Sequence, residues 1–171
     1  DTLFPQNSYN LNAERGLSSF NVKHRMVNSV LYQIPVGKGR RFLDHGGIAN
    51  VLIGGWELGT LLNIQSGFPV TMFSGRDQSN TGAGFDRPNQ IASGSINLDG
   101  ANANKWFNTS LFALQPLGTF GNVGRNTVIA PGFVQWDASL LKTFRFTERT
   151  GLQFRFEAFN AANHLNLGNP D

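Results

Sequence analysis

The stretch FVQWDASLLKTFRFTERTGLQFRFEAFN, residues 133–160, decides the fold class of this chain. Apolar and polar residues alternate along its second arm, residues 152–158, and along its first arm, residues 136–146. Since successive side chains of a β-strand point to opposite faces, the pattern predicts two strands, each with one apolar and one polar face. The short polar segment between them contains glycine and suits a hairpin turn. With Phe146 opposite Leu152, the apolar residues would form one stripe across both strands.

The apolar stripe has two interpretations. In a soluble β-sandwich it packs into a core, whereas in an outer-membrane barrel it faces lipid and the polar residues line the lumen. The membrane interpretation is favoured because the polar face carries Asp137, Arg145, Arg155 and Glu157 but no lysine, and because aromatic residues gather near the turn, as in an interfacial girdle. Lys142 argues against the membrane interpretation, since a lysine at the centre of the lipid face destabilises a barrel by about 2–4 kcal/mol. A β-bulge or a side chain extended toward the interface would relieve that cost.

The composition agrees with a β-rich protein and restricts its function. The chain has 171 residues, 15 phenylalanines, 20 glycines and only 15% charged residues, against about 25% in ordinary domains. It has no apolar run of about eighteen residues, which excludes a transmembrane helix, and no recognisable signal peptide. The absence of cysteine excludes disulfides and thiolate metal sites. The net charge of +3 is not gathered into a nucleic-acid-binding motif, so we expect no nucleic-acid partner.

The rest of the chain alternates between predicted strands and loops. Strands are expected over residues 20–35 and 56–70, and loops over residues 1–19 and 161–171. The glycine-rich connector 36–55 has an apolar middle, residues 48–53, that predicts a short helical turn or an interfacial segment.

Residues 71–130 form the longest segment without a strand or helix period. Loops of about sixty residues are uncommon in compact soluble domains, but outer-membrane barrels have long loops on one side and short turns on the other. Counting the strands in alternating directions places this segment on the extracellular side and the 147–151 turn on the periplasmic side. We therefore predict an all-β, antiparallel portion of a transmembrane β-barrel, with about four strands and long loops.

Many short motifs resemble, in the same order, the C-terminal barrel region of Oar-like TonB-dependent receptors. The motifs, from about residue 10 to the end, are HRM (24–26), QIPVGKGRR (33–41), GGWEL (54–58), QSGFP (65–69), DRPN (86–89), WFNT (106–109), GTFGN (118–122), GRN (124–126), WDASL (136–140), FRFEAFN (154–160) and NH (163–164). The resemblance implies a receptor that carries a carboxypeptidase-regulatory-like domain, a plug and an outer-membrane barrel. It implies localisation in the outer membrane and ligand uptake by the whole receptor.

The chain departs from that family pattern in what it lacks. It contains no plug, no TonB-interacting segment and no regulatory-like domain, and no final strand ending in an aromatic residue follows residue 170. About four strands do not close a barrel of the family's size, and open edges do not persist in a bilayer. We therefore expect residues 1–171 to be the C-terminal portion of a barrel domain. Its partners would be outer-membrane lipid, the remaining barrel and plug, TonB through that plug, and a small ligand.

No residue pattern predicts catalysis, a metal site or a cofactor. Ser66–Gly67 lacks the preceding glycine of a nucleophile elbow, and the three histidines lie far apart in the sequence. Asp137 and Glu157 share a face with two arginines, which favours a structural network over a glycosidase pair. A calcium loop beginning at Asp77 would lack most of its acidic ligands.

The best candidates for ligand contact lie in the long loop. Trp106, Phe107 and Phe120 offer flat surfaces for stacking, and Arg87 offers a charge, although such aromatics also serve to hold a loop in place. The predicted lumen network comprises Asp137, Arg145, Arg155 and Glu157.

The predicted function is a non-catalytic part of a TonB-dependent receptor barrel. The alternative is a soluble β-sandwich that binds a ligand, possibly a carbohydrate.

Overall fold

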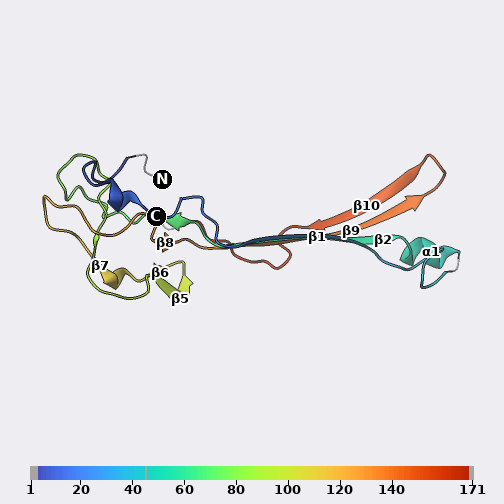
Figure 1. Ribbon diagram of the computed structural model, residues 1–171. Coiled ribbons are helices and arrows are strands. Elements are labelled where there is room, and N and C mark those ends of the chain that lie inside the picture. The colour runs from blue at the N-terminus through green and yellow to red at the C-terminus, as the bar shows by residue number, and fades with distance from the viewer. Residues whose placement is uncertain (1–3, 45, 170–171) are drawn as a thin grey trace. The chain divides into compact units, whose positions relative to one another are not determined.

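The computed structural model describes residues 4–44 and 46–169 and contains mostly strands and loops (Figure 1). These residues form two compact units, each assembled from separate parts of the chain. The sheet unit comprises residues 24–65 and 133–166, and the loop unit comprises the described residues of 1–23, 66–132 and 167–171. The alternation of apolar and polar residues with period two is confined to the sheet unit.

The sheet unit contains a four-stranded antiparallel sheet in the order β1-β2-β9-β10. The strands lie side by side in Figure 1 and have 9, 10, 13 and 8 residues, close to the roughly 9–11 that cross a bilayer. Their bounds are β1 (Arg25–Gln33), β2 (Trp56–Gln65), β9 (Phe133–Arg145) and β10 (Gly151–Ala158). The predicted antiparallel order of four strands is confirmed, although β1 begins after residue 20 and β2 ends before residue 70.

The register of the β9–β10 hairpin differs by two residues from the predicted one. Leu152 lies opposite Phe144, and Phe156 lies opposite Leu140. The predicted pairing of Phe146 with Leu152 is wrong because Phe146 belongs to the turn, where its N–H donates to the carbonyl of Thr150 at 3.0 Å. A shift of two residues keeps every side chain on its predicted face, whereas a shift of one would have exchanged the faces.

The register divides the sheet into an apolar face and a polar face. The apolar face is defined here by Met26, Val30, Tyr32, Trp56, Leu58, Leu62, Ile64, Trp136, Ala138, Leu140, Phe144, Leu152, Phe154, Phe156 and Ala158. The polar face is defined by Arg25, Ser29, Gln33, Glu57, Asn63, Gln65, Gln135, Asp137, Ser139, Thr143, Arg145, Gln153, Arg155 and Glu157. The separation is incomplete, because Val27, Leu31, Leu61 and Leu141 share the polar face.

Neither face of the sheet is covered by a packed core. Phe156 is 58% exposed and Leu58 is 44% exposed, and the fully buried apolar residues of the described chain, Leu111, Val123, Val128 and Ala130, all belong to the loop unit. The sheet is also open, since the strand pairings of the described residues leave one edge of β1 and one edge of β10 unpaired. A sheet with both faces uncovered and two free edges is suited to completion by further strands and by lipid.

Polar groups on the apolar face find partners within the sheet unit. Thr60, in the middle of that face, accepts a hydrogen bond from the indole N–H of Trp136 at 2.6 Å. A polar group in hydrocarbon is expensive unless it is bonded, so this contact removes most of the cost of Thr60.

Lys142 is the other exception on the apolar face, and it is 3% exposed. The strand register runs through it without a bulge, opposite both Trp56 and Phe154. Its ammonium donates to the carbonyls of Leu52, at 3.2 Å, and Gly54, and lies 5.0 Å from the ring centroids of Trp56 and Phe144. Of the two ways to relieve the cost of Lys142, the β-bulge is absent, and the extended side chain instead donates to carbonyls at the end of a helix.

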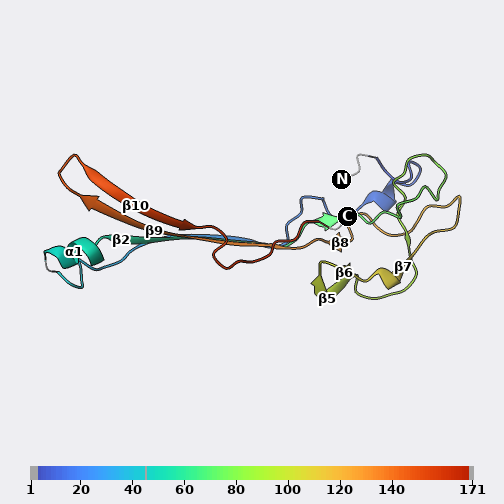
Figure 2. The same cartoon turned by 180° about the vertical axis from the view of Figure 1, so that it is seen from behind.

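That helix is α1 (Ile48–Ile53), in the connector between β1 and β2, as the apolar middle of the connector predicted. The connector also forms a bridge between Val36 and Phe42. Both views of the molecule show α1 at the end of the sheet where the β9–β10 turn lies (Figures 1 and 2). Lys142 connects α1 to the β9–β10 hairpin. It lies on β9 close to the turn, and its ammonium donates to carbonyls at the end of α1.

The loop unit consists of short, paired segments held by a small core. Its strands pair as β3 with β8, β4 with β7, and β5 with β6. Their bounds are β3 (Pro69–Val70), β4 (Asn89–Gln90), β5 (Asn97–Asn102), β6 (Lys105–Phe107), β7 (Phe112–Ala113) and β8 (Val128–Ile129), with 3-10 turns η1 (Leu11–Glu14) and η2 (Thr109–Leu111). The long segment 71–130 is thus more ordered than its sequence predicted.

A buried ion pair connects the N-terminal segment to this unit. The guanidinium of Arg87 donates to both carboxylate oxygens of Glu14, at 2.7 and 3.2 Å, and the two side chains are 3% and 13% exposed. Gln6 joins the cluster through two hydrogen bonds. Its side-chain oxygen accepts from the backbone N–H of Arg87 at 2.6 Å, and its backbone N–H donates to the carboxylate of Glu14 at 3.1 Å. The pair therefore fixes residues 6–14 against residue 87.

Gly67 is required where the chain passes residue 130. A Cβ at this position would overlap the carbonyl oxygen of Ala130, a backbone atom that is held by the adjacent β3–β8 pairing. We expect Gly67→Ala to lower the free energy of unfolding by about 1–3 kcal/mol, measured by urea denaturation. Gly168→Ala, whose Cβ meets open space, is the matched control and should change it by less than about 0.5 kcal/mol. Equal effects would show that residues 67 and 130 are not in close contact.

Within residues 4–44 and 46–169, no helix is long and apolar enough to cross a membrane.

Candidate functional site

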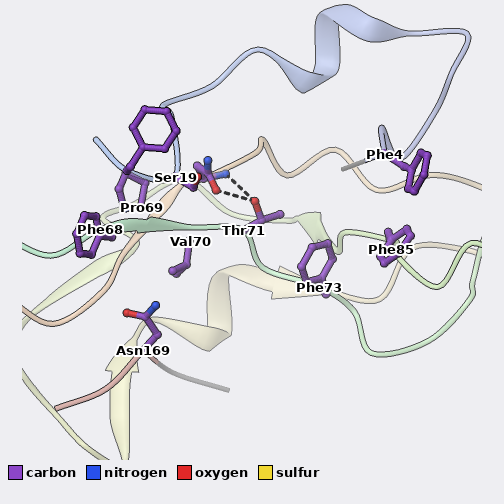
Figure 3. A pocket seen from close by; sticks show the side chains of 11 residues that line it. Phe4, Ser19, Phe68, Pro69, Val70, Thr71, Phe73, Phe85 and Asn169 are labelled. Atoms are coloured by element: carbon purple, nitrogen blue, oxygen red, sulfur yellow. Dashed lines mark hydrogen bonds between the residues drawn. The ribbon is translucent and has the colours of Figure 1, made fainter. Parts of the chain in front are cut away.

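A large cleft lies in the loop unit, and phenylalanine is the commonest residue in its lining. Its volume is about 740 Å³. Figure 3 shows the rings of Phe68, Phe73, Phe85 and Phe4 arranged around an open space. The complete lining comprises Phe4, Ser19, Phe20, Phe68, Pro69, Val70, Thr71, Phe73, Phe85, Asn126 and Asn169.

One wall of the cleft is held in place by Asn126. This residue is 3% exposed and has a positive φ of 54°, a conformation that asparagine tolerates better than most residues. Its side-chain oxygen accepts from the hydroxyl of Thr71 at 2.8 Å (dashed lines at Thr71 in Figure 3). Its amide nitrogen donates to the carbonyl of Leu17 at 2.6 Å. Three segments that are distant in sequence therefore meet at one asparagine.

The opposite wall is formed by two neighbouring aromatic rings. The ring centroids of Phe73 and Phe85 lie 6.4 Å apart with their planes at 58°, and Ser74 N–H donates to the carbonyl of Asp86 at 2.7 Å beside them. Phe73 is 41% exposed and Phe20 is 80% exposed, so the rings present uncovered apolar surface. Since the lining contains no charged side chain, the cleft suits a neutral ligand with a flat or apolar face.

The four residues predicted to contact ligand lie elsewhere in the loop unit. The indole of Trp106 donates to the carbonyl of Ile129 at 2.7 Å, and the ring of Phe107 packs edge-on against Phe112 at 6.3 Å. Arg87 is 2% exposed and bound to Glu14, and Phe120 is half-buried outside the lining of the cleft. These contacts fix the side chains of Phe107 and Arg87 within the loop unit, whereas Trp106 also lines a smaller cleft of about 230 Å³.

The phenylalanines of the cleft were missed because they have no common sequence pattern. They come from residues 4, 20, 68, 73 and 85, which are brought together only by the fold. The available signal was a large aromatic residue placed in a polar, non-periodic segment, since such a side chain must be buried locally or bind something.

Comparison with protein families decides what kind of protein contains these two units. The family model described as outer membrane beta barrel domain matches residues 1–171. The chain belongs to this outer-membrane β-barrel family. No curated protein and no solved structure matches the chain.

Membership of the outer-membrane β-barrel family assigns the chain to the outer membrane. The predicted fold class and localisation are confirmed, and the soluble β-sandwich alternative is wrong. No second sheet packs on the apolar face within the described residues, as a sandwich would require. The exposed side chains of that face are those of an outward barrel surface.

The predicted lumen residues of this barrel family member all lie on the polar face, but they do not form one network. Arg155 and Glu157 approach within 3.6 Å, with side chains 56% and 43% exposed. Asp137 is bound separately, because it accepts from the Gln135 amide at 2.8 Å and from the Asn160 N–H at 2.9 Å. Arg145 lies at the turn end of the same face.

The loop of the barrel domain that begins at Asp77 is closed by hydrogen bonds. The Asp77 carboxylate accepts from the N–H groups of Gly82 at 2.8 Å and Thr81 at 3.1 Å. Within the described part of the chain, no group of three or more histidine, aspartate or glutamate side chains is placed to hold a metal ion.

These hydrogen bonds give the loop a defined pH dependence. The N–H of Gly82, more than any other group, lowers the pKa of Asp77 below its ordinary value of 3.8. Since the folded pKa is depressed, the stabilising contribution is present above the ordinary value and is lost as pH falls through the lowered pKa. An NMR titration should give a midpoint for Asp77 below 3.8. In Ser79→Ala, which removes a hydroxyl that also donates to this carboxylate, at 3.3 Å, the midpoint should rise toward that value, and an unchanged midpoint would contradict the hydrogen-bonded arrangement of the loop.

Proposed function

We propose that this outer-membrane barrel domain is part of a TonB-dependent receptor that takes up a ligand, and that it is not catalytic. The observation that carries the proposal is the phenylalanine-lined cleft in the loop unit. Support also comes from the ordered motifs shared with Oar-like receptors. An aromatic cleft in the loop unit is suited to bind a ligand with a flat or apolar face, and a barrel sheet with one polar face is suited to line a lumen.

The two ends of the sheet receive different roles in this proposal. Gln65, the last residue of β2, pairs with Phe133, the first of β9, so the chain leaves for the loop unit and returns at the same end of the sheet. The connector and the β9–β10 turn lie at the other end. The loop unit would therefore be extracellular, where it contacts ligand or seals the mouth of the barrel, and the short turn would be periplasmic.

The polar face would line the lumen with bound, structural charges. Asp137 is held by Gln135 and Asn160, and Glu157 is near Arg155. We accordingly assign no catalytic residue, no metal and no cofactor.

The proposed partners follow from the receptor architecture. They are outer-membrane lipid around the apolar face, the rest of the barrel along the free edges of β1 and β10, and the plug within the barrel. TonB would act through that plug, and a neutral small ligand would occupy the cleft. We propose no nucleic-acid partner.

The receptor proposal is tested by TonB dependence in cells. The protein at its natural length should crosslink to TonB, and cells should accumulate at least one radiolabelled neutral oligosaccharide or aromatic compound only when both proteins are present. Absence of crosslinking, or accumulation that is independent of TonB, would show that the domain has another role in the outer membrane.

The role of the cleft is tested separately with Phe73→Ala combined with Phe85→Ala. Loss of two stacking surfaces should weaken ligand binding about tenfold or more, because each aromatic contact contributes on the order of 1 kcal/mol. The control is Leu117→Ala, since Leu117 is 79% exposed and outside the lining. Equal uptake by the double variant and the control would remove the cleft from the proposal.

A further inference from the structure

A second cleft lies in the sheet unit, at the end that carries the connector and the β9–β10 turn. Its volume is about 630 Å³. The connector contributes Lys38 and Arg40 to its lining, and the end of β9 contributes Phe144, Arg145 and Phe146. Cations and aromatic rings therefore meet in one cleft, which differs from the uncharged cleft of the loop unit.

Positive charge predominates around this cleft. The connector and the turn end carry six cations, Lys38, Arg40, Arg41, Lys142, Arg145 and Arg149, and three carboxylates, Asp44, Glu57 and Glu148. Two of the carboxylates accept uncharged donors, since Asp44 accepts from the Gly39 N–H at 2.6 Å and Glu57 from the Gln33 amide at 3.0 Å. An anion entering the cleft would thus meet a net positive surface.

The connector also exposes apolar side chains next to these cations. Phe42, Leu43, Ile48 and Leu52 are 53%, 55%, 80% and 63% exposed. Exposed apolar residues beside lysine and arginine are typical of segments that lie in the interface of a membrane. The hydrogen bonds from Lys142 to Leu52 and Gly54 hold this segment against the apolar face of the sheet, which is the lipid-facing one.

We propose that this cleft binds an anionic glycerophospholipid of the leaflet at the turn end of the barrel. Lys38 and Arg40, which line the cleft, contact the phosphate, and Arg41, next to Arg40 in the connector, adds positive charge. The acyl chains lie beside Phe144, on the apolar face, and Phe146, in the turn. A phosphate suits the site because guanidinium groups bind it with paired hydrogen bonds and the neighbouring rings exclude water. The proposal depends on membership of the outer-membrane barrel family and is independent of receptor function.

The test compares lipid retention by native mass spectrometry of the protein at its natural length, extracted in a mild detergent. Phosphatidylglycerol and phosphatidylcholine are added at equal concentrations, and we expect preferential retention of phosphatidylglycerol. The combined substitution Lys38→Gln, Arg40→Gln and Arg41→Gln should weaken its retention about tenfold or more, because each basic residue near an anionic lipid contributes about fivefold. Equal retention of the two lipids by the unaltered protein would overturn the proposal.

A charge-matched control separates a built site from general attraction. Arg15→Gln, Arg76→Gln and Lys105→Gln remove the same charge from exposed positions of the loop unit and should leave retention unchanged. An equal loss in both triple variants would reduce the effect to net charge and overturn the site.

Two further measurements keep the result decisive if the variant folds poorly. A heat-modifiable electrophoretic shift reports folding of each variant. In the unaltered protein, raising the salt from about 0.1 to 1 M should release phosphatidylglycerol, since screening weakens exposed phosphate contacts. Retention that survives the salt, or a preference for lipopolysaccharide over phosphatidylglycerol, would exclude the proposed lipid.

Discussion

Leu140→Arg should lower the free energy of unfolding by about 2–4 kcal/mol, whereas Leu141→Arg, one residue further along the same strand, should change it by less than about 1 kcal/mol. Leu140 lies on the apolar face of β9 between Leu58 and Phe156, near the middle of the sheet. An arginine there would be placed in hydrocarbon. Leu141 lies on the polar face between Glu57 and Arg155, where a new cation meets one charge of each sign.

The two substitutions form their own control, because residue type, strand and chemical change are the same. Unfolding free energies are measured by urea titration of the protein folded into phospholipid vesicles, followed by tryptophan fluorescence. A larger loss for Leu141→Arg would show that the two faces have been assigned in the wrong order. Equal losses would show that neither face meets lipid.

Glu14→Ala should destabilise the loop unit by about 3–5 kcal/mol, because it leaves the guanidinium of Arg87 buried without a counter-charge. The nitrogen Nε of Arg87 already has no hydrogen-bond partner among the described residues. The cluster therefore has no spare acceptor to replace the lost carboxylate of Glu14. The loss is measured by urea denaturation and by faster hydrogen exchange at the backbone N–H of Arg87, which donates to the side chain of Gln6.

A double variant distinguishes the desolvated charge from the lost packing. Replacing both Glu14 and Arg87 by methionine removes the charges together and should recover much of the stability lost in Glu14→Ala. Glu148→Ala, an exposed residue of the β9–β10 turn, should have little effect. If the double variant is as unstable as the single one, the pair contributes through shape and hydrogen bonding instead of through its charges.

The sheet unit could be predicted from sequence because its signal is local. Alternation along residues 136–146 and 152–158 was sufficient to identify β9, β10 and the face of each side chain, and it survived a register error of two residues. The error arose at Phe146, which continues the apolar alternation but takes part in the turn. An alternating pattern does not mark where hydrogen bonding between strands stops.

The contacts of Lys142 and the cleft phenylalanines could not be predicted in this way. Whether the buried charge of Lys142 destabilises the fold depends on the carbonyls of residues 52 and 54, some ninety positions earlier in the chain, which accept its hydrogen bonds. The cleft depends on Asn126 joining Thr71 to Leu17, and Arg87 on a glutamate 73 residues away. Residue type alone singled out Arg87 as a possible ligand contact, but only the fold shows that its guanidinium is buried against Glu14.

The pairing of Gln65 with Phe133 has a consequence for how such a protein can diversify. The segment between these two residues must satisfy one geometric condition set by the sheet. Its first and last residues must lie roughly 5 Å apart, which is the spacing of neighbouring strands. Any insert that satisfies this condition can be exchanged without altering the strands that cross the membrane. Recombination between related genes could therefore change what is recognised outside the cell, and a designer could graft a new recognition segment at the same junction.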